Sequence, residues 1–103
     1  MGFHKLTYPI AMIPAYVDRT GNQIEYRAGW TDENYQFGFF NNGKSFTATD
    51  LRTGRVITNQ KTRKACVEWI ENNMVKLVAL FATDEYAQWV EEFEQWKKED
   101  SNV

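Results

Sequence analysis

The sequence predicts a single α+β domain in which an antiparallel meander sheet of four to five strands packs against two C-terminal helices. The length of 103 residues is typical of one domain. Through about residue 60, apolar and polar residues alternate in short runs separated by turn residues, which is the period of half-buried strands. After Thr62 the apolar spacing changes to three and four residues, as in amphipathic helices.

Two strands are expected before residue 31. Residues 6–17 are rich in apolar and β-prone side chains, and a polar turn follows at 18–22. Pro9 and Pro14 cannot donate to a ladder, so this strand should lie at a sheet edge or contain a bulge. In the next strand, residues 23–30, period-two alternation places four apolar side chains on one face: Ile24, Tyr26, Ala28 and Trp30.

The third strand is expected at residues 35–40, after a turn at 31–34. Tyr35, Phe37 and Phe39 alternate with the other residues of this strand and should share one face. Gly38 lies in the middle of the strand, where glycine indicates a bulge or a close backbone approach.

Two hairpins complete the predicted sheet. The Asn42-Gly43 pair is preferred by tight hairpin turns, so residues 45–49 should pair back on the third strand. A second turn at 51–54 should lead into a short last strand at 55–58.

Thr62 is a suitable N-cap for the first helix. Its apolar stripe comprises Cys66, Trp69, Ile70, Met74, Leu77 and Phe81. Asn72 and Asn73 either end this helix, leaving residues 74–81 as a strand, or mark a point where it continues or kinks. The second of these alternatives is preferred.

The last helix should begin after Thr83, because Asp84 and Glu85 then face the positive end of the helix dipole. One of its faces carries five large side chains: Tyr86, Trp89, Val90, Phe93 and Trp96. Packing of this stripe on the sheet, or between two copies in a homodimer, is the simplest structural explanation for it.

The usual catalytic and metal-binding arrangements are missing from the sequence. Cys66 is the only cysteine and falls on an apolar stripe, and His4 is the only histidine. A four-ligand Cys/His zinc site is therefore excluded, and no phosphate-binding glycine loop opens a helix. We expect a non-enzymatic protein without a metal or cofactor. A single cysteine also favours a reducing, cytoplasmic location, and no apolar run is long enough to span a membrane.

Charge is divided along the chain. Residues 44–66 contain six basic and one acidic side chain, whereas residues 67–103 contain three basic and nine acidic ones. The fold should therefore have a positive and a negative end, which would help to orient a macromolecular partner. The aromatic content of 16% is also high for so small a core, so some rings should reach the surface.

The first functional hypothesis is a protein-binding domain, for example a phage or mobile-element inhibitor or accessory protein that acts on a host enzyme handling nucleic acids. The candidate contact residues lie on the last helix: Glu91, Glu92, Glu94 and Trp96. The glutamates would occupy the place where such an enzyme accepts phosphates.

The alternative hypothesis is direct binding to DNA or RNA. Its candidate residues come from the second hairpin and the helix start: Lys44, Arg52, Arg55, Lys61, Arg63 and Lys64. If they converge on one edge, they would meet phosphates while Phe40 and Phe46 stack on bases. The net charge of −2 counts against this alternative, since nucleic-acid domains of this size are usually basic.

Overall fold

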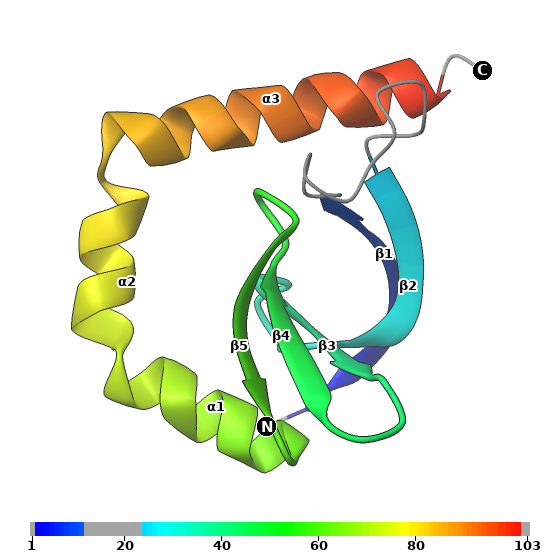
Figure 1. Ribbon diagram of the computed structural model, residues 1–103, viewed down its shortest axis with the longest axis vertical. Helices are drawn as coiled ribbons and strands as arrows, with labels where there is room; N and C mark the ends of the chain where they lie inside the picture. The colour runs from blue at the N-terminus through cyan, green and yellow to red at the C-terminus, as the bar shows by residue number, and fades with distance from the viewer. Residues whose placement is uncertain (1, 12–23, 102–103) are drawn as a thin grey trace.

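The computed structural model describes residues 2–11 and 24–101. It contains five strands followed by three helices (Figure 1). The elements are β1 (His4–Ala11), β2 (Ile24–Thr31), β3 (Phe37–Asn41), β4 (Phe46–Asp50), β5 (Arg55–Gln60), α1 (Arg63–Asn72), α2 (Met74–Phe81) and α3 (Asp84–Ser101).

The strands form one antiparallel meander in the order β1-β2-β3-β4-β5. The predicted α+β class and sheet topology are confirmed. Pro9 lies in β1 at the edge of the sheet, as the missing donor requires. Pro14, the remainder of the expected first strand and the turn at 18–22 lie outside the described residues.

The predicted buried face of β2 is partly wrong. Ile24 is buried and Trp30 is half-buried, but Tyr26 and Ala28 are exposed. The reason lies in the pairing: β2 spans eight residues beside β1 but meets β3 only at Trp30 and Thr31. In the described part of the chain, most of β2 therefore has β1 alone beside it, and alternation in sequence does not translate into burial there.

The third strand begins later than predicted because Asp32 organises the preceding turn. Its Oδ1 accepts hydrogen bonds from the backbone N–H groups of Gln36 and Phe37, both at 2.8 Å. Tyr35 adopts a φ of +55° in this turn and is exposed, so the expectation that it shares a strand face with Phe37 and Phe39 was wrong. Phe37 and Phe39 are buried as predicted.

Gly38 in β3 leaves room for the ring of Tyr8, which reaches it from β1. A Cβ built on Gly38 would lie 2.6–2.9 Å from three atoms of that ring, which is too close for any larger residue. The close approach expected at this glycine is therefore made by a side chain. The predicted β3–β4 hairpin is also confirmed, with Gly43 at a φ of +98° in its turn.

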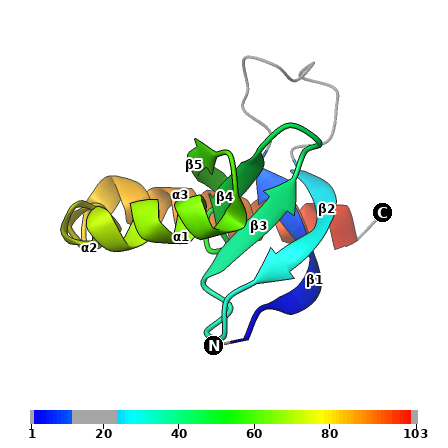
Figure 2. The same cartoon turned by 90° about the horizontal axis from the view of Figure 1, so that it is seen from below.

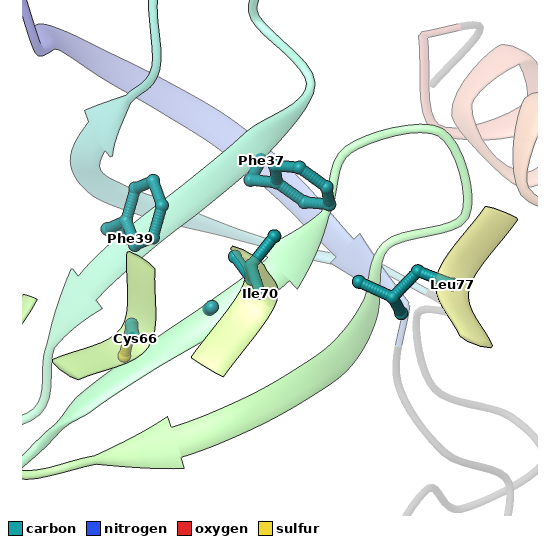
Figure 3. Packing of buried hydrophobic residues seen from close by; sticks show 6 residues of the cluster. Phe37, Phe39, Cys66, Ile70 and Leu77 are labelled. Carbon is teal, nitrogen blue, oxygen red and sulfur yellow. The ribbon is translucent and has the colours of Figure 1, made fainter. Parts of the chain in front are cut away.

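The main core lies between β3, β4, α1 and α2 (Figure 3). Its buried residues are Phe37, Phe39, Ala48, Cys66, Ile70 and Leu77. Phe37 and Phe39 point to the same side of β3, where Cys66 and Ile70 from successive turns of α1 meet them. The helix thus covers this face of the sheet, as its apolar spacing predicts.

There are three helices rather than the predicted two, because the helical chain breaks at Asn73. The side-chain Nδ2 of Asn73 donates to the Trp69 carbonyl at 2.8 Å, and its backbone N–H bonds to the last turn of α1. Residues 74–81 then form α2, so the strand alternative is wrong and the preferred helical conformation of this segment is confirmed, with a break at Asn73 that makes it a separate helix. Thr62 caps α1 as expected, its Oγ1 accepting from the Ala65 N–H at 3.0 Å.

Helix α3 turns back over the sheet after a second confirmed cap, in which Thr83 Oγ1 accepts from the Tyr86 N–H at 3.1 Å. Its buried Phe93 packs against Gly54 in the β4–β5 turn. The same turn binds the end of β1, because the Ala11 N–H donates to the Gly54 carbonyl at 2.9 Å. The three helices consequently form an arch beside β5 (Figures 1 and 2).

Candidate functional site

Helix α2 is apolar around most of its circumference. Every residue in it except Lys76 is apolar, yet only Leu77 is buried. Val75 is 85% exposed, Val78 56% and Met74 36%. These three side chains are one helical turn or less apart, and we call them the outer face of α2. A helix that is hydrophobic on all sides is normally enclosed, so this exposure marks a candidate interaction surface.

On its inner side, α2 borders a groove of about 470 Å³ between the helices and β5, which we call the aromatic groove. This volume is in the range of about 300–1,000 Å³ found for ligand-binding pockets. Its apolar lining comes from β5 and all three helices: Val56, Ile57, Trp69, Leu77, Leu80, Phe81, Trp89 and Trp96. Its polar lining comes from the β4–β5 turn and the start of α3: Asp50, Thr53, Arg55 and Tyr86.

A β-bulge in β5 shapes one wall of the aromatic groove. Strand pairing passes from Thr49 opposite Val56 to Ala48 opposite Thr58, which leaves Ile57 as an extra residue. Successive residues of a regular strand point to opposite faces. Here both Val56 and Ile57 line the groove.

The polar end of the aromatic groove is built around the buried carboxylate of Asp50. Its Oδ2 accepts hydrogen bonds from the Tyr86 hydroxyl at 2.6 Å and from Thr53 Oγ1 at 2.9 Å. Charge-assisted bonds of this kind stabilise a carboxylate that has lost its water. Because Tyr86 lies on α3 and Asp50 ends β4, these bonds fix the helix to the sheet.

Two arginines lie beside this polar end. The guanidinium of Arg52 is 5.1 Å from the centre of the Tyr86 ring, and that of Arg55 is 4.1 Å from the centre of the Trp89 ring. Among the described side chains, neither guanidinium forms an ion pair with a carboxylate. The groove therefore has a positively charged end held by cation–π contacts.

The six basic candidate residues do not converge on one edge, contrary to the expectation for a nucleic-acid surface. Arg52 and Arg55 lie at the β4–β5 turn, where Asp50 pairs with Arg55. The other four lie beyond the opposite end of this hairpin, where Phe46 pairs with Gln60: Lys44, Lys61, Arg63 and Lys64. The two paired ends of the hairpin are four residues apart along β4, which is about 13 Å at a rise of about 3.3 Å per strand residue.

Some of these basic side chains also lie over aromatic rings. Arg63 lies 4.1 Å from the centre of the Phe3 ring. The two rings expected to stack on bases, Phe40 and Phe46, are half-buried, and Arg27 lies over Phe40 at 4.8 Å. Lys44, Lys61 and Lys64 remain exposed.

The four candidate residues on α3 fall into two settings. Glu91, Glu92 and Glu94 are exposed, and Glu94 forms an ion pair with Lys97 at 2.6 Å. Trp96 is half-buried and lines the aromatic groove. The glutamates are therefore solvent-facing charges, while the tryptophan belongs to the groove.

The described residues offer little for covalent or metal chemistry. Cys66 is buried, burial raises the pKa of its thiol, and Sγ lies 3.5 Å from the Phe46 carbonyl oxygen. A raised pKa disfavours the reactive thiolate. No group of three or more His, Cys, Asp or Glu side chains in the described ranges is placed to hold a metal ion. None of the helices described is long and apolar enough to cross a membrane.

Stability should fall at alkaline pH because two tyrosines are buried. Burial raises the pKa of Tyr8 to about 12, and burial together with the Asp50 hydrogen bond raises the pKa of Tyr86 further. A raised folded-state pKa means that the stabilisation is complete below the unfolded value of about 10 and is lost as pH rises above it. We expect the denaturation midpoint to be flat from pH 8 to 9 and to drop between pH 10 and 12. Tyr86→Phe should reduce the steepness of this drop, and an equally steep drop in that variant would contradict the assignment.

Sequence reasoning missed the outer face of α2 and most of the aromatic groove. A signal for the first was present, since MVKLVALF has more apolar residues than one stripe needs. The groove had no comparable signal because its lining comes from segments between Ala11 and Trp96 that only the fold brings together.

No protein-family model, curated protein or solved structure matches the chain.

Proposed function

We propose that this chain is a small non-enzymatic protein-binding domain, an inhibitor or accessory factor, that docks on its partner through the outer face of α2 and the adjoining aromatic groove. The exposure of α2 is the observation that carries the proposal. Burying apolar surface contributes roughly 25 cal/mol per Å², and the fold leaves Val75 and Val78 largely uncovered. A protein partner would remove this surface from water.

The acidic residues of α3 give the proposed partner its electrostatic character. Glu91, Glu92 and Glu94 are exposed on a helix that adjoins the aromatic groove. Exposed charges of one sign mainly raise the association rate and select against partners of the same sign. A host enzyme that handles nucleic acids has a basic surface and suits this charge, which supports the phage or mobile-element inhibitor as the specific form of the proposal.

Direct nucleic-acid binding is the alternative, and it has weaker support. The basic residues are divided between the two ends of the β4–β5 hairpin, and three of the arginines lie over aromatic rings. Only the group around Lys61 and Lys64 retains exposed charge next to a helix start. Binding to DNA or RNA in low salt that is abolished by Lys61→Glu with Lys64→Glu would establish this alternative.

The proposal is tested by affinity capture from host lysate with the chain and two variants. The double variant Val75→Glu, Val78→Glu should recover at least about tenfold less partner, because charges would have to be buried in an apolar interface. The triple variant Glu91→Lys, Glu92→Lys, Glu94→Lys should still bind at high salt but associate more slowly at low salt.

Both variants change exposed side chains, so their unfolding midpoints should stay close to that of the parent chain and serve as the folding control. Undiminished recovery by the valine variant would reject docking through α2. Capture of no protein would reject the proposed function. Recovery of the chain alone, with sedimentation as a dimer, would replace the partner by a second copy.

A further inference from the structure

We infer that the aromatic groove receives a peptide segment of the partner in which large apolar side chains are combined with an acidic residue, and that the acidic residue pairs with Arg55. This inference rests on the proposed protein-binding function and specifies the partner segment. It uses two features of the groove that the outer face of α2 lacks: a fixed cation and residues of β5, the edge strand of the described sheet.

Arg55 supplies the charge complementarity. Its guanidinium is held 4.1 Å from the centre of the Trp89 ring, so its position is restricted before any ligand binds. The side chain is half-buried and lines an otherwise largely apolar groove. A planar guanidinium in this setting is well suited to bind a carboxylate with two parallel hydrogen bonds.

The carboxylate already present in the groove, that of Asp50, does not form an ion pair with Arg55. Asp50 is buried, and its Oδ2 is engaged by Tyr86 and Thr53. No carboxylate from the described part of the chain forms an ion pair with Arg55. An incoming aspartate or glutamate would therefore find the guanidinium available, whereas a basic residue would be repelled by it and by Arg52 nearby.

The form of the groove favours a polypeptide over a small ligand. Among the described residues, strand β5 is the last strand of the sheet and pairs with β4 alone, which leaves its other side outside the ladder that they form. Such an edge offers backbone donors and acceptors that an incoming chain can match. Val56 and Leu80, both lining residues, remain 56% and 37% exposed and can pack against apolar side chains of that chain.

The helices restrict how much of a partner can enter. The arch of α1, α2 and α3 stands beside β5 (Figure 1). A whole sheet from a second copy would meet these helices before reaching the strand edge. A single segment is the occupant that we infer for the groove.

The inference is tested by selecting a displayed library of random short peptides on the full chain. The expected binders carry two or more large apolar residues next to Asp or Glu. Fluorescence polarisation of a selected peptide should show more than about tenfold weaker binding to the Arg55→Glu variant. A selection repeated on Arg55→Glu should enrich Lys or Arg at the position of the acid.

One further pair of variants and one single charge reversal serve as controls. Leu80→Gln, at the groove rim, should weaken the selected peptide, whereas Val78→Gln, on the outer face of the same helix, should not. Lys64→Glu reverses an exposed charge on α1 and should leave the peptide affinity unchanged.

Selected peptides without an acidic preference, or binding unaffected by Arg55→Glu and Leu80→Gln, would overturn the inference. So would saturable binding of indole-3-acetate in the absence of any peptide binder, which would indicate a small-molecule site. A partner captured from lysate with undiminished yield by Arg55→Glu would reject the acidic segment while leaving the proposed function standing. Failure to capture any partner would reject the proposed function itself.

Discussion

Replacement of Phe39 by alanine is expected to lower the free energy of unfolding by about 3–5 kcal/mol. The ring is 1% exposed and lies in the main core between β3 and α1. Its cross-strand neighbours are Trp30 and Ala48, so its removal would open a cavity at the centre of the sheet. A domain of this size has a total stability of about 5–15 kcal/mol, and the variant should be close to unfolding at 37 °C.

Phe40 provides the matched control, because it is the next residue of β3 and faces the other side of the sheet. It is half-buried, so Phe40→Ala should cost clearly less than Phe39→Ala. Equilibrium denaturation in urea measures both losses. Equal losses would contradict the placement of the core on the side of the sheet that α1 covers.

The second large effect is expected at Gly54. Its φ is +70°, and a Cβ there would lie 2.5 Å from the Ala11 nitrogen and 2.5 Å from an atom of the Phe93 ring. Gly54→Ala combines backbone strain of about 1–2 kcal/mol with displacement of two neighbours. The Ala11 nitrogen donates the hydrogen bond that holds the end of β1 to this turn. The Phe93 ring makes the contact that packs α3 against the turn. We expect a total loss above about 2 kcal/mol.

Gly43 separates these two causes. It also has a positive φ, +98°, but a Cβ there would have no heavy atom within 4 Å. Gly43→Ala should therefore show the cost of strain alone. The unfolding midpoint of Gly54→Ala should be the lower of the two, and a smaller effect at Gly54 than at Gly43 would argue against the close packing of β1, the turn and α3.

Much of the fold could be predicted because its signals are local. Alternation around Phe37 and Phe39 gave the correct buried face of β3, and the Asn42-Gly43 pair gave the correct hairpin. Both helix caps, Thr62 and Thr83, follow from side-chain chemistry within three residues. Local hydrogen bonds and the spacing of apolar residues are sufficient to predict these features without knowledge of tertiary contacts.

The misjudged positions depend on contacts that the sequence does not encode locally. Tyr35 has the alternation of a strand residue, but the Asp32 carboxylate binds the following N–H groups and moves the strand start to Phe37. Tyr26 has the same pattern and is exposed, because β3 pairs with β2 only at Trp30 and Thr31 among the described residues. In both cases, tertiary contacts determined the outcome.

The candidate site depends even more on tertiary contacts than the fold does. Trp96 was found from the aromatic stripe of α3, but its position in a groove depends on how β5 and α2 are arranged around it. The basic residues were counted correctly along the chain, yet the length of the β4–β5 hairpin separates them. Adjacency in sequence was therefore a poor guide to which charges act together.

Site-specific photo-crosslinking tests the proposed docking surface most directly. A photoreactive residue would be placed in turn at Val75 on α2, Glu91 on α3 and Lys64 on α1, all of which are exposed. If the partner docks on α2, the adduct should form from position 75 and be much weaker from the other two. An adduct from position 91 or 64 with none from position 75 would contradict docking through α2.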